Sequence, residues 1–207
     1  MKMYLSSYEL GNETGKLRNM VPGNNKVGYI FNALDFTGAD PERKQKRVER
    51  NMNELNILGF DCFELDLRKY FGKPDALGEL VNTLGAIWVS GGNVFVLRQA
   101  FKLSGFDEIL LNLNKRDDFL YGAYSAGVCV LSPTLDGYHV VDDATDTPFE
   151  GLDEVLWDGL GIIDYTFLPH FESDHPESES VNTVLEYCKE KGLQYKTLRD
   201  GEVIIIE

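Results

Sequence analysis

The feature that most constrains the fold is an apolar run followed at once by a glycine turn and a helix-like stretch. Residues 85–89 (GAIWV) are continuously apolar, as expected of a strand buried on both faces of a parallel sheet. Residues 90–93 (SGGN) form a turn, and apolar residues then recur at helical spacing from Val94 to Phe101. A strand, a tight turn and a helix in this order predict one unit of a parallel α/β sheet.

The same alternation continues along the chain. Strand-like segments occur at residues 2–7, 26–31, 61–67, 119–121, 162–168, 194–198 and 202–206. Helix-like segments begin at Asp40-Pro41 and near Pro74, and others cover 106–113, the residues after Ser125, and 178–191. This order predicts an α/β fold with a mostly parallel sheet and helices on both faces. We expect one domain over residues 1–207, because no repeat or linker divides the chain.

Composition excludes several classes of function. The chain has 207 residues, 43% of them hydrophobic, which is typical of a globular domain. Its formal net charge of −14 argues against nucleic-acid partners and against an anionic membrane surface. No apolar segment has the length of a signal peptide or a transmembrane helix. The three cysteines are few and lack CxxC spacing, so we expect buried free thiols in a cytoplasmic protein and no structural zinc site.

One strand-to-helix turn carries a serine. Residues 118–131 read DFLYGAYSAGVCVL, with Ser125 between Gly122 and Gly127. A nucleophile elbow, G-x-S-x-G, projects its serine at the carboxyl edge of a sheet. Here the pattern is G-x-x-S-x-G, one residue longer, and an ordinary N-cap serine is the alternative interpretation.

Two further strand ends carry polar groups of other kinds. The backbone N–H groups of Gly91, Gly92 and Asn93 suit a developing oxyanion, although a plain tight turn would look the same. His170 follows the predicted strand 162–168, whereas His139 and His175 are better explained as structural or exposed histidines. Parallel strand ends share one edge, so a hydroxyl, an imidazole and an amide-lined hole can meet there.

An imidazole base also needs a carboxylate that fixes its tautomer. The residues alone leave this acid open among five carboxylates: Asp200, Asp146, Asp142, Asp143 and Glu202.

Three segments together resemble the dipeptidase E-like family of serine peptidases, which includes the aspartyl dipeptidases and is related to the cyanophycinases. They are residues 88–99 (WVSGGNVFVLRQ), 121–131 (YGAYSAGVCVL) and 167–172 (FLPHFE). The resemblance implies a flavodoxin-like or class I glutamine-amidotransferase-like three-layer sandwich. It assigns Ser125 as nucleophile and His170 as its base.

The resemblance also implies the remaining site residues. Gly92 and Ala126 correspond to the oxyanion donors, with Gly91 and Asn93 in the same turn. A family glutamate in an L-x-E-G turn corresponds to Asp200 in residues 198–201 (LRDG), one methylene shorter. Asp146 matches an aspartate also assigned to the family's triad, so we expect Asp200 as the acid, with Asp146 as the alternative.

The chain departs from the family at two places. Its serine turn reads AYSAG, and residues 171–182 (FESDHPESESVN) contain no arginine that could pair with a substrate aspartate. The carboxylates of Glu172, Asp174, Glu177 and Glu179 would instead suit a free amino terminus or a basic side chain.

We therefore expect a cytoplasmic serine hydrolase that cleaves short peptides without specificity for N-terminal aspartate. It would need no metal or organic cofactor and would be a monomer or homodimer. The alternatives are an amidase acting on a small molecule or modified peptide, and a non-catalytic binding protein on the same fold.

Overall fold

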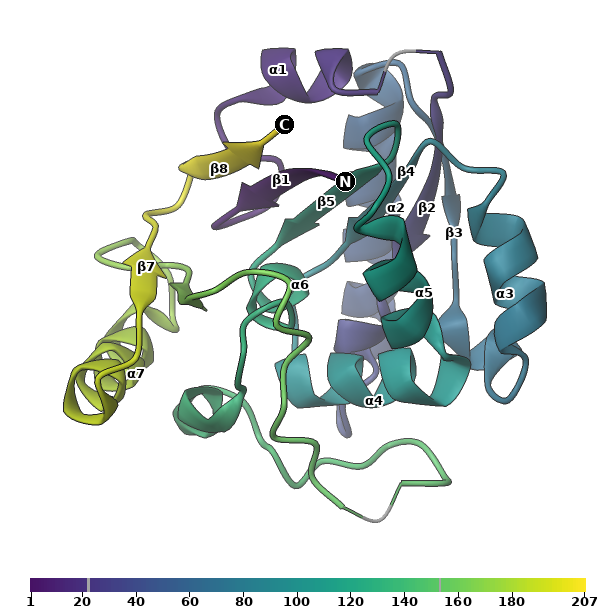
Figure 1. Cartoon of the computed structure of the whole chain (residues 1–207). Coiled ribbons are helices and arrows are strands. Elements are labelled where there is room, and N and C mark those ends of the chain that lie inside the picture. The colour runs from purple at the N-terminus through teal and green to yellow at the C-terminus, as the bar shows by residue number, and fades with distance from the viewer. Residues whose placement is uncertain (22, 153) are drawn as a thin grey trace.

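The computed structural model describes residues 1–21, 23–152 and 154–207 of the chain. Its centre is a six-stranded sheet in the order β3-β2-β4-β5-β1-β8 (Figure 1). The strands are Lys2–Ser6 (β1), Lys26–Ile30 (β2), Asp61–Glu64 (β3), Ala86–Val89 (β4), Leu120–Tyr124 (β5) and Val203–Ile206 (β8). Only β8 runs antiparallel to its neighbour, β1, within this sheet. The prediction of a mostly parallel sheet is confirmed.

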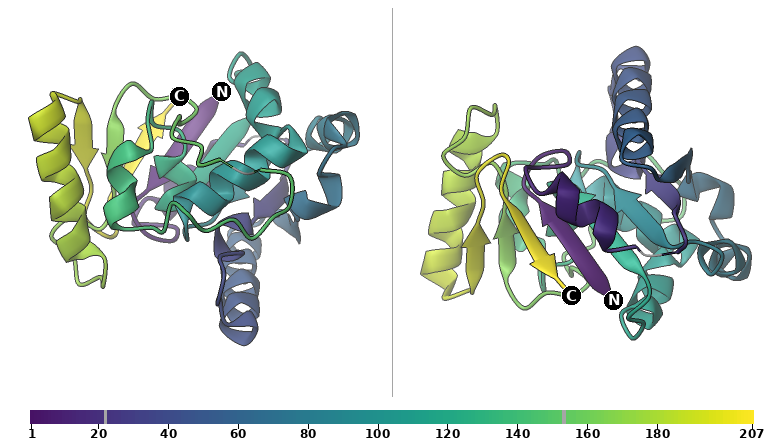
Figure 2. Two further views of the ribbon diagram at one scale, coloured as in Figure 1. Left: turned by 90° about the horizontal axis from the view of Figure 1, so that it is seen from below. Right: turned by 90° about the horizontal axis from the view of Figure 1, so that it is seen from above.

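Helices cover both faces of this sheet (Figure 2). One face carries α1 (Thr14–Asn19) and α2 (Pro41–Ile57). The other carries α3 (Pro74–Val81), α4 (Val94–Ser104), α5 (Phe106–Leu113) and the short α6 (Ala126–Cys129). Strand β4 is buried on both sides, because Trp88 packs into the first core while Ile87 and Val89 pack into the second. The apolar run that predicted a central strand thus has a partner layer on each face.

A small second sheet corrects one prediction. Strand β6 (Thr166–Leu168) is shorter than the predicted 162–168 and pairs in parallel with β7 (Tyr195–Thr197), outside the main sheet. Strand β8 already occupies the edge beside β1, which leaves β6 to pair elsewhere. Helix α7 (Ser178–Lys191) packs against β6, and this unit lies to one side of the main sheet (Figure 1).

Short helical turns account for other differences. The predicted strand 61–67 ends at Glu64, because the Asp66 side chain accepts a bond from the Arg68 N–H and caps a 3-10 turn, Leu67–Tyr70. Two more 3-10 turns are Asn32–Leu34 and Asp136–Val140. Helix α1 was not predicted; it is six residues long and buries only Leu17.

Two expectations from composition concern membrane-spanning helices and the state of the cysteines. None of the helices in the described residues combines the length and the apolar character needed to cross a lipid bilayer. The three cysteines, Cys62, Cys129 and Cys188, are buried and free of disulfides, as predicted.

Candidate active site

Ser125 occupies a strained turn between β5 and α6. Its backbone has φ 48° and ψ −120°, a positive-φ conformation that non-glycine residues adopt rarely. The turn is stabilised because the Ser125 carbonyl accepts bonds from the N–H groups of Val128 (2.8 Å) and Cys129 (2.9 Å), while its own N–H donates to the Ser6 carbonyl (3.3 Å). This is the strand-turn-helix context that a nucleophile elbow requires.

The glycine turn after β4 packs against this elbow. A Cβ added to Gly91 would lie 2.9 Å from the Ser125 Cβ, and one added to Gly92, at φ 143°, would overlap the Ala33 carbonyl. The side chains of Ser125 and Tyr124 at Gly91, and the Ala33 backbone at Gly92, therefore leave space only for glycine. The N–H groups of Gly92 and Ala126 have no acceptor among the described residues, and both residues line a small cavity with Ser125. They are free to donate to a developing oxyanion.

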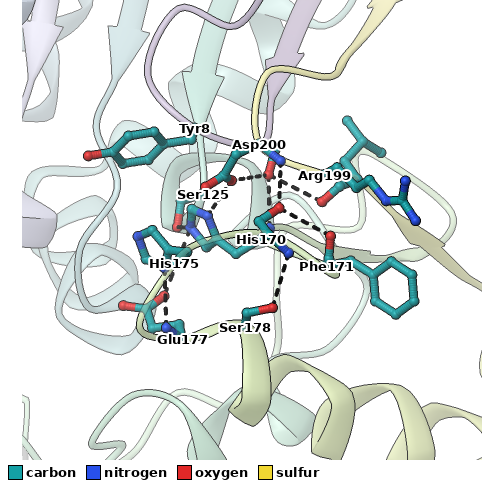
Figure 3. A network of polar contacts seen from close by, with 12 residues as sticks. Tyr8, Ser125, His170, Phe171, His175, Glu177, Ser178, Arg199 and Asp200 are labelled. Carbon is teal, nitrogen blue, oxygen red and sulfur yellow. Dashed lines mark hydrogen bonds and ion pairs between the residues drawn. The ribbon is translucent and has the colours of Figure 1, made fainter.

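His170 joins Ser125 to Asp200 (Figure 3). Its Nε2 lies 3.1 Å from the Ser125 Oγ, and its Nδ1 lies 2.7 Å from Asp200 Oδ1. A carboxylate can only accept, so the proton is on Nδ1 and the bare Nε2 accepts the Ser125 hydroxyl. The His170 side chain is 1% exposed. The structure thus brings together three of the predicted residues in the order hydroxyl, imidazole, carboxylate.

Opposing effects act on the pKa of His170. Burial lowers it below its ordinary value, and the coulombic interaction with the neighbouring His175 lowers it further. The hydrogen bond from Nδ1 to Asp200 and the charges of Asp200 and Glu177 raise it, but less strongly. His170 is therefore held neutral at neutral pH, the form in which an imidazole accepts a proton.

Two serines that sequence reasoning missed hold this arrangement. The buried Ser7 hydroxyl donates to Asp200 Oδ1 (2.9 Å) and accepts the backbone N–H of His170 (2.8 Å). The Ser173 hydroxyl accepts the backbone N–H of Asp200 (2.8 Å). The available signal for Ser7 was its place at the end of β1, which lies beside β5 in the parallel sheet.

A second histidine lies against the first. The His175 ring stacks on the His170 ring with centroids 3.6 Å apart and planes 7° apart, and Tyr8 contacts both rings edge-on (Figure 3). His175 Nδ1 accepts the Glu177 backbone N–H (3.2 Å). Glu177 Oε2 lies 3.9 Å from His170 Nε2. His175 thus belongs to the site, although its role was not predicted.

The other candidate acids make no hydrogen bond to His170 among the described residues, which argues against the alternative of Asp146. Both Asp146 carboxylate oxygens accept bonds from Thr37, one from its N–H (2.8 Å) and one from its hydroxyl (2.6 Å). The remaining carboxylates also have other donors: Asp142 binds the Val94 N–H, Asp143 binds Thr145, and Glu202 binds the Arg199 N–H. Asp200 is the member of the predicted set whose carboxylate reaches His170.

Most polar groups of Asn93, which was predicted as a member of the oxyanion turn, are engaged in structure. Its side-chain oxygen caps α4 by accepting the N–H groups of Phe95 (2.8 Å) and Val96 (3.1 Å). Its own N–H donates to the Ala33 carbonyl, and its side-chain amide donates to the Asp143 carbonyl. The backbone N–H of Asn93 and one of the two N–H groups of its side-chain amide are therefore already engaged.

The cavity beside Ser125 is small and carries negative charge. Its volume is about 20 Å³, space for about one water molecule, and its apolar walls include Val141, Leu168, Val181 and Val184. The carboxyl groups of Asp142 and Glu177 also line it. Burial raises the pKa of Asp142 to about 7, against the effect of the Val94 N–H, and the charge of Glu177 contributes to the rise. Two mutually repelling carboxyl groups favour a cation.

The same histidines form the one potential metal-ligand group among the described residues. Ligand atoms of His170, His175 and Glu177 lie within 4.8 Å of one another. The stacked rings direct their nitrogen lone pairs side by side instead of toward a common point, and His175 Nδ1 already accepts a bond. This arrangement fits a base and its neighbours better than a metal centre.

Comparison with known proteins identifies the family. The model of peptidase family S51 matches residues 15–207. The chain belongs to this family. The resemblance to the dipeptidase E-like peptidases is thereby confirmed, and a peptidase activity is supported.

Two relatives are uncharacterized peptidases of Listeria. The one from Listeria monocytogenes is 30% identical over 144 residues, 68% of this chain and 65% of the relative. The one from Listeria innocua is 27% identical over 162 residues, 77% of this chain and 72% of the relative. The chain thus spans about two thirds of the length of the first of these relatives.

Two solved structures share the fold of this chain. A candidate peptidase E protein from Listeria monocytogenes superposes with a TM-score of 0.71 at 20% identity, covering 100% of this chain and 98% of the other. A peptidase from an acI-B1 Actinobacterium gives 0.62 at 17% identity, covering 89% and 74%. The flavodoxin-like, class I glutamine-amidotransferase-like fold is confirmed.

Proposed function

We propose that this protein is a serine peptidase that cleaves short peptides, with Ser125 as nucleophile, His170 as base and Asp200 as the acid. The observation that carries the proposal is the continuous hydrogen-bonded path from the Ser125 hydroxyl through both nitrogens of His170 to Asp200. Family membership supports the coarser statement that the protein is a peptidase.

The reaction follows from this geometry. His170 Nε2 takes the Ser125 proton as Oγ attacks the scissile carbonyl carbon, and the carbonyl oxygen becomes an oxyanion bound by the Gly92 and Ala126 N–H groups. Asp200 stabilises the imidazolium. The imidazolium then gives its proton to the leaving amine, and the C–N bond breaks. Water, deprotonated by His170, attacks the acyl-enzyme and releases the acid product together with free Ser125.

The charges near Ser125 support a substrate with a free amino terminus. Asp142 and Glu177 line the cavity, so an ammonium group there would relieve their mutual repulsion. The same carboxyl groups disfavour an N-terminal aspartate, and the small cavity volume favours a small first side chain. We therefore propose short peptides with a free amino group on a small, uncharged first residue. The cytoplasmic location stays a prediction.

A serine-directed fluorophosphonate tests the nucleophile. We expect a single adduct on Ser125, found by peptide mass mapping, and no adduct in Ser125→Ala. Ser125→Ala should lower kcat/KM for Ala-Ala by about 10⁴-fold or more. A folded protein that hydrolyses peptides but is labelled elsewhere would contradict the assignment.

A substrate panel tests the proposed specificity. We expect Ala-Ala to be cleaved better than Asp-Ala and better than N-acetyl-Ala-Ala, which lacks the ammonium group. Labelling of Ser125 without cleavage of any peptide would indicate an amidase acting on another substrate. Ligand binding without labelling or turnover would indicate a binding protein.

A further inference from the structure

Helix α2 carries one basic residue that differs from the others. Four of its basic side chains each have a carboxylate partner: Arg43 with Asp40, Lys44 with Asp35, Lys46 with Glu42, and Arg50 with Glu9. Arg47 is half-buried, yet among residues 1–21, 23–152 and 154–207 no carboxylate or other acceptor binds it. Guanidinium groups that are partly removed from water are normally paired, so this group is available to a ligand.

Arg47 faces the space that leads to Ser125. It lines a cleft of about 730 Å³, a size typical of small-ligand sites. Gly92, Asp142 and Glu177 line both this cleft and the cavity beside Ser125, so the two spaces adjoin. Arg47 is the only basic residue among the described residues that line the cleft.

Helix α2 is tied to the strand that carries Ser125. One turn beyond Arg47, the side-chain oxygen of Asn51 accepts the hydroxyls of Tyr29 and Tyr124, each at 2.9 Å. Tyr124 immediately precedes Ser125. Burial raises the pKa of Tyr124, and the positive charge of Arg47 opposes this rise, as expected of a nearby guanidinium. Residues four apart share a helix face, so Arg47 and Asn51 are directed toward the same end of β5.

We propose that Arg47 binds a carboxylate on the leaving-group side of the scissile bond, namely the C-terminal carboxylate of a dipeptide. This inference rests on the proposed function. A guanidinium binds a carboxylate through two parallel hydrogen bonds. With the substrate ammonium group near Glu177 and Asp142, a carboxylate at Arg47 orients the peptide with its carbonyl at Ser125. Arg47 is then the residue that makes the enzyme selective for short substrates.

The test compares matched peptides on matched variants. Wild type should cleave Ala-Ala about 10- to 100-fold better, in kcat/KM, than Ala-Ala-amide, because the amide lacks the charge that Arg47 binds. Arg47→Gln should remove this preference by lowering kcat/KM for Ala-Ala alone, and Arg47→Lys should restore part of it. Lys46 pairs with Glu42 on the exposed face of the helix, so Lys46→Gln should keep the wild-type preference. Ala-Asp-amide, whose only carboxylate is on its side chain, should be cleaved no better than Ala-Ala-amide, and a preference for it that Arg47→Gln removes would overturn the assignment to the C-terminal carboxylate.

A binding measurement separates failure of this inference from failure of the proposed function. Titration calorimetry with Ser125→Ala needs no turnover, so it applies even if no peptide is cleaved. We expect Ala-Ala to bind about 10- to 100-fold tighter than Ala-Ala-amide, and Ser125→Ala combined with Arg47→Gln to bind both equally. Equal binding of both peptides by Ser125→Ala, no binding of either, or an equal effect of Arg47→Gln on both would overturn the assignment to Arg47.

Discussion

The Ser7 side chain holds His170 and Asp200 in position relative to Ser125. Its hydroxyl bonds the Asp200 carboxylate and the His170 backbone, and it lies at the end of β1, next to β5. Ser173 holds the Asp200 backbone from the other side. An aspartate therefore reaches the imidazole even though its side chain is one methylene shorter than a glutamate, because the turn itself is held close.

Substitution of Asp200 and of Asp146 distinguishes which carboxylate acts on His170. Asp200→Asn should lower kcat/KM by about 10³- to 10⁴-fold, because an amide no longer selects the tautomer with the proton on Nδ1 and no longer stabilises the imidazolium. Asp146→Asn should change it less than about threefold, since its carboxylate binds Thr37. Steady-state kinetics on both variants, with circular dichroism to verify folding, measures the contrast. The reverse order of effects would reject Asp200 as the acid.

The surroundings of His170 predict opposite pH effects for two of its neighbours. Activity requires neutral His170, and its pKa is lowered chiefly by burial and then by His175, so the acid limb of kcat/KM should lie below pH 6.5. His175→Phe keeps an aromatic ring but removes the second titratable imidazole, whose coulombic effect lowers the pKa of His170, so that pKa should rise and the limb should move to higher pH.

Glu177→Gln removes a negative charge that raises the same pKa, so the limb should move to lower pH. Full pH profiles of kcat/KM for wild type and both variants, which report the free enzyme, check the two directions. Movement of both limbs in one direction would show that these charges do not act through His170.

At the scale of elements, β4 and β5 explain why the serine motif is one residue longer than the usual elbow. Gly122 is directly paired with Trp88 on the neighbouring strand, and a Cβ at this glycine would overlap the indole ring. Gly122 thus provides space within the sheet, whereas Ala123 and Tyr124 complete the strand before the turn. The positive φ at the turn is adopted by Ser125 itself.

This packing predicts opposite effects for two glycine substitutions. Gly122→Ala should lower the free energy of unfolding by about 1–3 kcal/mol, because the added methyl group must displace Trp88. Gly78→Ala in α3 should raise it by about 0.5–1 kcal/mol, since a Cβ there meets no atom closer than 3.9 Å and alanine favours helix. Urea denaturation followed by tryptophan fluorescence measures both. A neutral Gly122→Ala would mean that the indole ring moves freely.

Element boundaries were predictable where a local signal was strong. Helices α5 and α7 begin and end at the predicted residues, and Asp40-Pro41 begins α2 as expected. Helix α1 was missed because it has no side-chain cap and one buried residue. Asn93 was assigned to the oxyanion site because a residue directly after β4 can either donate its N–H to an oxyanion or cap the next helix. The structure shows that its side-chain oxygen caps α4.

At the scale of the whole molecule, the site combines residues from two sheets. Ser125 and Ser7 come from the main sheet, whereas His170 follows β6 in the small sheet. The sequence could predict that a strand precedes His170, but hydrophobic periodicity does not specify which strand is its neighbour. Long-range partners such as Ser7 and Arg47 carry no motif, so they could not be recognised before the fold was known.

The segment that contains Asp200 joins these two sheets, since β7 before it belongs to the small sheet and β8 after it to the main one. A ribosome makes Ser125 and His170 before it makes this segment. During synthesis the imidazole therefore lacks its carboxylate until residues 195–206 have emerged and docked on both sheets. On the proposed mechanism, the growing chain cannot cleave peptides efficiently before its fold is complete.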